Sequence, residues 1–129
     1  MASNTPLFAE GENAEQLTSD TEELRQQGWA LDDKRTGVSK TFHFKSYFKA
    51  VSFLVTIASE SSVKKHHPTM TVDIGTVYVH WTTHRPLGLT LKDISMARFC
   101  DDGAELMGAV ECGQGLNCDR SGTEKSSKA

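Results

Sequence analysis

The sequence predicts an α+β domain in which a four-stranded antiparallel sheet carries three helices on one face. Two pairs of segments show period-2 alternation of apolar and polar residues, which is typical of strands. Three segments with helix-capping signals or a wide apolar arc precede, separate and follow them. The order is therefore helix, two strands, helix, two strands, helix. A length of 129 residues with 37% hydrophobic residues suits one such domain.

The domain is expected to span residues 16–110, after a loose polar arm at residues 1–15. Ser19 followed by Glu22 fits a capping box that starts the first helix, and Gly28 is placed to end it. Only a weak apolar stripe runs between these signals. We therefore expect a short first helix.

A hairpin is expected next, because two alternating stretches enclose the polar segment 32–37. Trp29 and Leu31 alternate in its first strand, and Trp29 is expected to be a core or rim aromatic. One parity of its second strand holds Val38, Lys40, Phe42 and Phe44.

Ser46 is placed to cap a second helix from about residue 47 to about residue 59. The apolar arc of this helix is too wide for one sheet face to cover. In so small a domain the additional cover would come from another subunit, so the sequence predicts a homo-oligomer. The apolar residues are Tyr47, Phe48, Ala50, Val51, Phe53, Leu54, Val55, Ile57 and Ala58.

The second hairpin region contains four of the five histidines of the chain. Residues 70–74 alternate, Gly75-Thr76 can turn, and residues 77–84 alternate again. In an antiparallel pair the end of the second strand returns to the start of the first. His84 should therefore lie beside the His66-His67-Pro68 corner, and three imidazoles would line one small site.

The parity of the last strand separates core positions from open positions. His80 lies about 13 Å from His84 along the strand, so it is expected outside the site. His43 is expected to be a surface or hydrogen-bonded residue. With the helices on one face, the inward positions are Val77, Val79 and Trp81, and the open positions are His80, Thr82 and His84.

A third helix is expected after the Pro86-Leu87-Gly88 break. Thr90 with Asp93 marks its start, and Gly108 is placed to end it. Beyond this helix the chain is rich in glycine, serine, asparagine and lysine, and residues 111–129 are expected to form a disordered tail.

The composition limits the classes of partner. A net charge of -3 gives no general attraction for nucleic acid. No apolar run approaches the roughly 18 residues of a membrane span, and the polar start lacks a signal-peptide core, so a cytoplasmic protein is expected. Cys100, Cys112 and Cys118 do not have zinc-knuckle spacing and are expected to be free thiols.

The histidine pattern resembles the pterin-4a-carbinolamine dehydratase family. That family has a His-His-Pro corner, an aromatic residue in the following hairpin, a histidine at its end and an aspartate shortly after. This chain supplies His66-His67-Pro68, Tyr78, His84 and Asp93, and the resemblance extends from Trp29 to Phe99. Ser62 and Lys65 depart from the pattern, which often has acidic residues at both positions.

The resemblance implies loss of water from a 4a-hydroxytetrahydropterin, which gives the quinonoid dihydropterin for tetrahydrobiopterin recycling. An acid must protonate the departing hydroxyl and a base must take the N5 proton, and neither step needs a metal or a redox cofactor. Imidazoles suit both roles near pH 7. The resemblance also implies a homodimer or homotetramer.

We expect His66, His67 and His84 to be the catalytic residues. Adjacent side chains in extended backbone point apart, so His66 and His67 should have unlike roles. His66 and His84 are expected to transfer protons, and His67 to hold and polarise the pterin. Asp93 is expected either to orient a histidine or to cap the helix. The expected substrate-binding residues are Trp29, Pro68, Thr82, Thr83 and Asp93.

Two alternatives remain open from the sequence. His66, His67 and His84 are enough ligands for a catalytic zinc ion, although no carboxylate second shell is evident. Some animal members of the family also act as coactivators of a homeodomain transcription factor through a helix, which would place such a protein in the nucleus as well. The long apolar helix around residues 48–57 permits that use.

Overall fold

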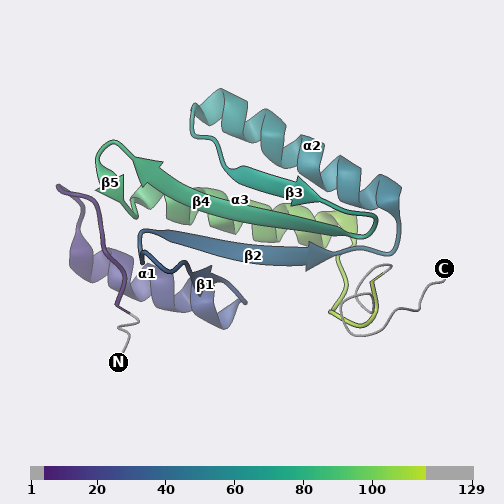
Figure 1. Ribbon diagram of the computed structural model, residues 1–129, viewed down its shortest axis with the longest axis horizontal. Coiled ribbons are helices and arrows are strands. Elements are labelled where there is room, and N and C mark those ends of the chain that lie inside the picture. The colour runs from purple at the N-terminus through teal and green to yellow at the C-terminus, as the bar shows by residue number, and fades with distance from the viewer. Residues whose placement is uncertain (1–4, 116–129) are drawn as a thin grey trace.

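The computed structural model describes residues 5–115 and confirms the predicted α+β class (Figure 1). The chain runs helix, hairpin, helix, hairpin, helix, as the sequence indicates. Its elements are α1 (Ala14–Gln26), β1 (Ala30–Leu31), β2 (Gly37–His43), α2 (Tyr47–Lys64), β3 (Thr69–Val72), β4 (Thr76–His84), β5 (Leu87–Gly88) and α3 (Leu91–Met107).

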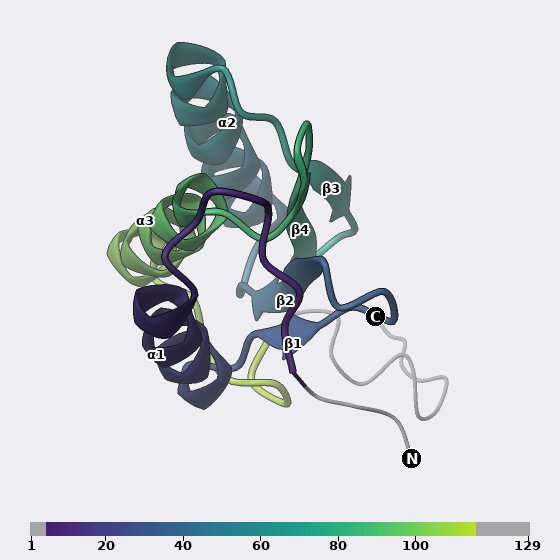
Figure 2. The ribbon, with the colours of Figure 1, turned by 90° about the vertical axis from the view of Figure 1, so that its left-hand side faces the viewer.

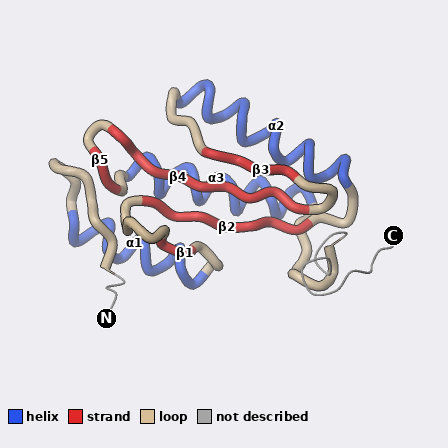
Figure 3. The backbone as a smooth tube through the Cα atoms, viewed as in Figure 1, coloured by secondary structure: helices blue, strands red, loops and turns tan. Residues whose placement is uncertain are grey.

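All strand pairs are antiparallel, and the strand order is β1-β2-β4-β3 (Figure 3). The short β5 also pairs with β4, so the sheet has five strands where four were predicted. The three helices cover one face of the sheet, as expected, and leave the other face open (Figure 2). No helix among residues 5–115 is long and apolar enough to cross a membrane.

The expected start of the first helix at Ser19 is wrong. Helix α1 begins at Ala14, because the side chain of Asn13 accepts a hydrogen bond from the backbone N–H of Gln16 at 3.1 Å and caps the helix upstream of Ser19. The cap of α2 is as predicted, with the Ser46 hydroxyl accepting from Lys49 N at 3.1 Å. That helix continues to Lys64, beyond its expected end.

The segment before α1 is hydrogen-bonded to the sheet end. The N–H of Leu89 donates to Leu7 O at 3.0 Å, and the N–H of Ala9 donates to Leu89 O at 2.9 Å. Gly88 has a φ of 132°, and a Cβ there would lie 2.6 Å from Ala9 N. Only glycine therefore allows this close approach. Most of the expected tail at 111–129 lies outside the described residues.

The predicted parity of β4 is confirmed. Val77, Val79 and Trp81 are fully buried against the helices. Beneath β2, the ring of Phe53 lies 4.8 Å from that of Phe42 and 5.2 Å from that of Phe44, measured between centroids. These apolar contacts attach α2 to the sheet and fix where its C-terminal end lies.

A buried thiol lies beneath the last strand. The indole N–H of Trp81 donates to Sγ of Cys100 at 3.4 Å, and burial raises the pKa of this thiol to about 12. Cys100 is free, as expected. Cys112 is disulfide-bonded, so the expectation of a free thiol is wrong there.

The raised pKa of Cys100 predicts a loss of stability in alkali. The unfolded thiol releases its proton near pH 9, whereas the folded thiol keeps it until about pH 12. The free energy of unfolding should therefore fall across this window by up to about 1.4 kcal/mol per pH unit from this group. Urea unfolding of the parent and of Cys100→Ala tests this. The variant should start less stable but decline less steeply with pH, and equal slopes would contradict the assignment.

Candidate active site

The end of α2 places His66 against the start of α3. Lys65 ends the helix in the left-handed conformation, with a φ of 56°, and the N–H of His66 donates to Ser61 O at 3.1 Å. The turn directs the imidazole inward. Its Nε2 atom lies 2.6 Å from Oδ1 of Asp93, which is fully buried. A buried carboxylate needs such a partner, since burying it alone would cost several kcal/mol.

Asp93 is both a helix cap and a partner of histidine. Its Oδ2 atom accepts from the backbone N–H of Thr90 at 3.0 Å, which completes a capping box at the start of α3. The same oxygen accepts from the hydroxyl of Thr83 at 2.8 Å. The two expectations for Asp93 are therefore not alternatives, because one carboxylate joins α3, β4 and His66.

The ring of His66 is also fixed on its face. It stacks on Trp81, with 5.7 Å between ring centroids and 12° between planes, and its side chain is only 11% exposed. Among residues 5–115 its second nitrogen, Nδ1, has no hydrogen-bond partner. The arrangement leaves His66 with one anchored nitrogen and one nitrogen available to a ligand.

His67 and His84 lie at the same end of the sheet but are exposed. The register pairs Thr69 with His80, so His84 lies beyond the start of β3, level with the corner. Thr83 holds this end of β4 to the Asp93 network. No direct contact joins His84 to the other two rings in the described chain, so any ligand would have to bridge them.

The other expected site residues have different surroundings. Pro68 is half-buried at the corner, just before β3. The Thr82 hydroxyl donates to Thr36 O at 2.6 Å and so holds the β1–β2 loop. The indole N–H of Trp29 lies 3.0 Å from Asp101, about 12 Å along α3 from Asp93. The structure thus does not bring Trp29 to the Asp93 network.

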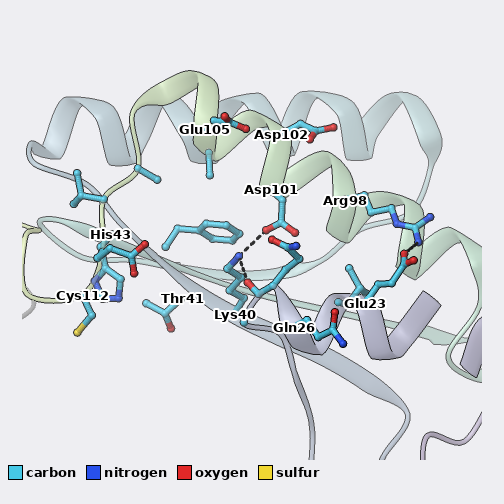
Figure 4. Close-up of a pocket in the computed structure, with 18 residues that line it drawn as sticks. Glu23, Gln26, Lys40, Thr41, His43, Arg98, Asp101, Asp102, Glu105 and Cys112 are labelled. Atoms are coloured by element: carbon cyan, nitrogen blue, oxygen red, sulfur yellow. Dashed lines mark hydrogen bonds and ion pairs between the residues drawn. The ribbon is translucent and has the colours of Figure 1, made fainter. Parts of the chain in front are cut away.

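A second polar network includes the Trp29 indole. Two of its members, Lys40 and Asp101, line a cleft of about 960 Å³ (Figure 4). The ammonium of Lys40 lies 2.7 Å from Asp101 and 2.6 Å from Gln27 O, which joins β2, α3 and the end of α1. None of the residues expected to form the site lines this cleft. The ion pair between Lys40 and Asp101 therefore has a structural role.

Sequence reasoning missed three of these contacts. Trp81 was recognised as a core residue, but its stacking on His66 depends on the corner geometry. Nε2 of His80 lies 2.8 Å from Oδ2 of Asp32 and so joins β4 to the loop between β1 and β2. The hairpin pattern predicts this loop but not where it lies relative to β4. The ion pair of Lys40 had a weak signal, namely a lysine on the inward parity of β2.

Among residues 5–115 no group of three or more His, Cys, Asp or Glu side chains is arranged to hold a metal ion. His66 instead uses Nε2 for Asp93, and within the described part of the chain His84 makes no hydrogen bond or ring contact with it. The geometry of the described residues therefore does not support the alternative of a zinc ion bound by His66, His67 and His84.

Comparison with known proteins agrees with the fold. The family model described as pterin 4 alpha carbinolamine dehydratase matches residues 10–103. The chain belongs to this family. A relative from Nitrosomonas eutropha, provisionally named a pterin-4-alpha-carbinolamine dehydratase, is 38% identical over 90 residues, which cover 70% of this chain and 74% of the relative.

Two solved structures of related proteins share the family fold. One is a transcriptional coactivator/pterin dehydratase from Brucella melitensis, with a TM-score of 0.61, 33% identity and coverage of 65% of this chain and 90% of that one. The other is a pterin dehydratase-like protein described as a RuBisCO assembly factor in the alpha-carboxysome. It has a TM-score of 0.54 and 23% identity over 60% of this chain and 89% of that one, and shows the fold alone.

We predict that Asp93→Asn lowers the free energy of unfolding by about 2 kcal/mol or more, because the buried network loses its charge and one acceptor. Urea unfolding measures this loss. Asp102→Asn is the matched control, since Asp102 is exposed on the same helix and should change stability by no more than about 0.5 kcal/mol. Equal effects of the two variants would show that the network is not what stabilises the start of α3.

Proposed function

We propose that this family member dehydrates 4a-hydroxytetrahydropterin to the quinonoid dihydropterin, a hydro-lyase reaction of tetrahydrobiopterin recycling. The observation that carries the proposal is the orientation of His66 by the buried Asp93, because a fixed imidazole with one free nitrogen is what proton transfer requires. The family membership supports the same reaction class.

His66 and His84 are proposed to transfer the two protons. The carboxylate of Asp93 holds His66 through Nε2, so Nδ1 faces the substrate and exchanges the proton. His84 is exposed at the end of β4 and acts on the other side of the pterin. Elimination breaks the C4a–O bond, with one imidazole protonating the hydroxyl and another taking the N5 proton. Each transfer contributes about 10²–10⁴-fold.

The remaining residues have different proposed roles. His67 is exposed at the corner and is proposed to polarise the pterin ring, with Pro68 bordering it. The hydroxyls of Thr82 and Thr83 donate to Thr36 and Asp93 and therefore position the end of β4. Trp29 is not assigned a substrate contact, since its indole belongs to the Asp101 network.

We predict that His66→Ala and His84→Ala each lower kcat/KM for dehydration by about 10²-fold or more. The assay follows freshly generated 4a-hydroxytetrahydrobiopterin with chelator present. His43→Gln is the control, because His43 lies at the opposite end of β2, paired with Thr76, and should keep the parent rate. A folded parent without activity would refute the dehydratase, and activity that chelator removes would favour the zinc alternative.

We also propose that the chain forms a homodimer or homotetramer through α2. Three large apolar side chains on one side of this helix are exposed, namely Phe48 at 79%, Val55 at 53% and Val63 at 73%. Their spacing of seven and eight residues forms one stripe along the helix. An exposed stripe of this kind marks a protein interface.

A coactivator-type role would use the same stripe for a different protein. The structural relative from Brucella melitensis carries both descriptions in its name. This role is the second candidate, with a transcription factor as the partner. It differs from self-association in requiring a heterologous complex through α2.

Phe48→Asp is predicted to reduce the native molecular mass of the protein, because it places a charge within the stripe. Sedimentation velocity or light scattering measures the mass. Leu106→Asp is the control, since Leu106 is 89% exposed on α3 and outside the stripe. If the parent is already a monomer, self-association through α2 is ruled out and the coactivator role gains weight.

A further inference from the structure

Four cationic residues lie beside the His66–Asp93–Thr83 network in the sequence. Each is within two residues of a network member, and all four are exposed. This is a local excess in a chain whose net charge is -3. The four residues are Lys64, Lys65, Arg85 and Lys92.

Two of these cations already have acidic neighbours. Lys64 lies 3.7 Å from Glu60 one turn earlier in α2. Lys92 follows Leu91, whose backbone N–H donates to the carboxylate of Glu12 at 3.0 Å, so a negative charge lies close to it. Their charges are therefore partly balanced within the protein.

Lys65 and Arg85 have no such partner. Among residues 5–115 neither side chain makes a hydrogen bond or an ion pair. Lys65 immediately precedes His66, and Arg85 immediately follows His84. The two unpaired cations thus flank the two imidazoles to which proton transfer is assigned.

The backbone of Lys65 makes its side chain notable. With a φ of 56° it occupies the left-handed cap position that favours glycine. The other residue of this kind in the described chain is Arg35, whose guanidinium donates to Thr5 O at 3.2 Å. Lys65 bears the same conformational cost, but within residues 5–115 its ammonium makes no hydrogen bond or ion pair. A side chain kept at a strained position beside a site indicates a function for that side chain.

We propose that, besides the neutral dihydroxypropyl pterin of the recycling reaction, the site takes a reduced pterin with an anionic side chain, bearing a phosphate ester or a carboxylate, and that Lys65 and Arg85 bind this anion. The inference rests on the proposed dehydratase function. A dihydroxypropyl side chain is neutral, so it offers two cations nothing to neutralise. A phosphate or carboxylate would receive charge-assisted hydrogen bonds from both, while His66 and His84 act on the ring.

The test compares three freshly generated 4a-hydroxytetrahydropterins. One has the neutral dihydroxypropyl side chain, one a phosphomonoester and one a glutamyl carboxylate side chain. We expect kcat/KM of the parent to be about tenfold higher for at least one anionic substrate, and this preference should shrink as salt is added. Preference for the phosphate or for the carboxylate substrate alone identifies which anion is taken.

Lys65→Gln and Arg85→Gln should each reduce that preference about fivefold and leave the rate with the neutral substrate unaltered. Lys45→Gln is the matched control, because Lys45 is exposed at the opposite end of the sheet, beyond the His43–Thr76 pair. Lys65→Gly separates function from folding. It should keep or raise the melting temperature, since glycine suits the left-handed cap, yet lose the preference as Lys65→Gln does.

Equal kcat/KM for neutral and anionic substrates in parent and variants would overturn the anion site and leave the dehydratase intact. Equilibrium dialysis with the unhydroxylated tetrahydropterins distinguishes the remaining cases. If nothing is dehydrated but the anionic pterin binds more tightly in a manner dependent on Lys65 and Arg85, the anion site stands and the reaction fails. If binding is also indifferent to charge, the anion site is overturned as well.

Discussion

The buried carboxylate of Asp93 is the constraint on which the site depends. It caps α3 through Thr90 N, holds β4 through the Thr83 hydroxyl and anchors His66 through Nε2. A fully buried charge is tolerated only when its acceptor capacity is used in this way. The start of α3, the end of β4 and the corner that holds His66 therefore meet at the side chain of Asp93. This contact fixes the position of the His66 ring.

The alternation along β4 then divides the strand between packing and chemistry. Trp81 and Thr83 face the helices, where one stacks on His66 and the other binds Asp93. His84 belongs to the opposite parity and stays exposed. A register shift by one residue would exchange these two sets, so the apolar packing of Val77 and Val79 indirectly decides which histidine reaches solvent.

The cationic residues near the two ends of α3 differ in how fully they are paired. The ammonium of Lys40 binds the carboxylate of Asp101 and the backbone carbonyl of Gln27. These contacts join β2 to α3. At the other end of α3, the cations beside the histidines have few or no partners in the described chain. The first arrangement is complete within the protein, whereas the second leaves charge available to a ligand.

The sequence by itself determined the element order, the parity of β4 and the Ser46 cap, because period-2 alternation and capping are local properties. It also indicated the family through the spacing of its histidines. Only the tertiary structure decided that Asp93 both caps α3 and binds His66, and that β5 exists. It also decided that Trp29 contacts Asp101, which lies about 12 Å along α3 from Asp93. These features depend on which segments meet across long loops, and no local pattern encodes such meetings. The early start of α1 is different, since the cap at Asn13 was a local signal that the competing Ser19 box obscured.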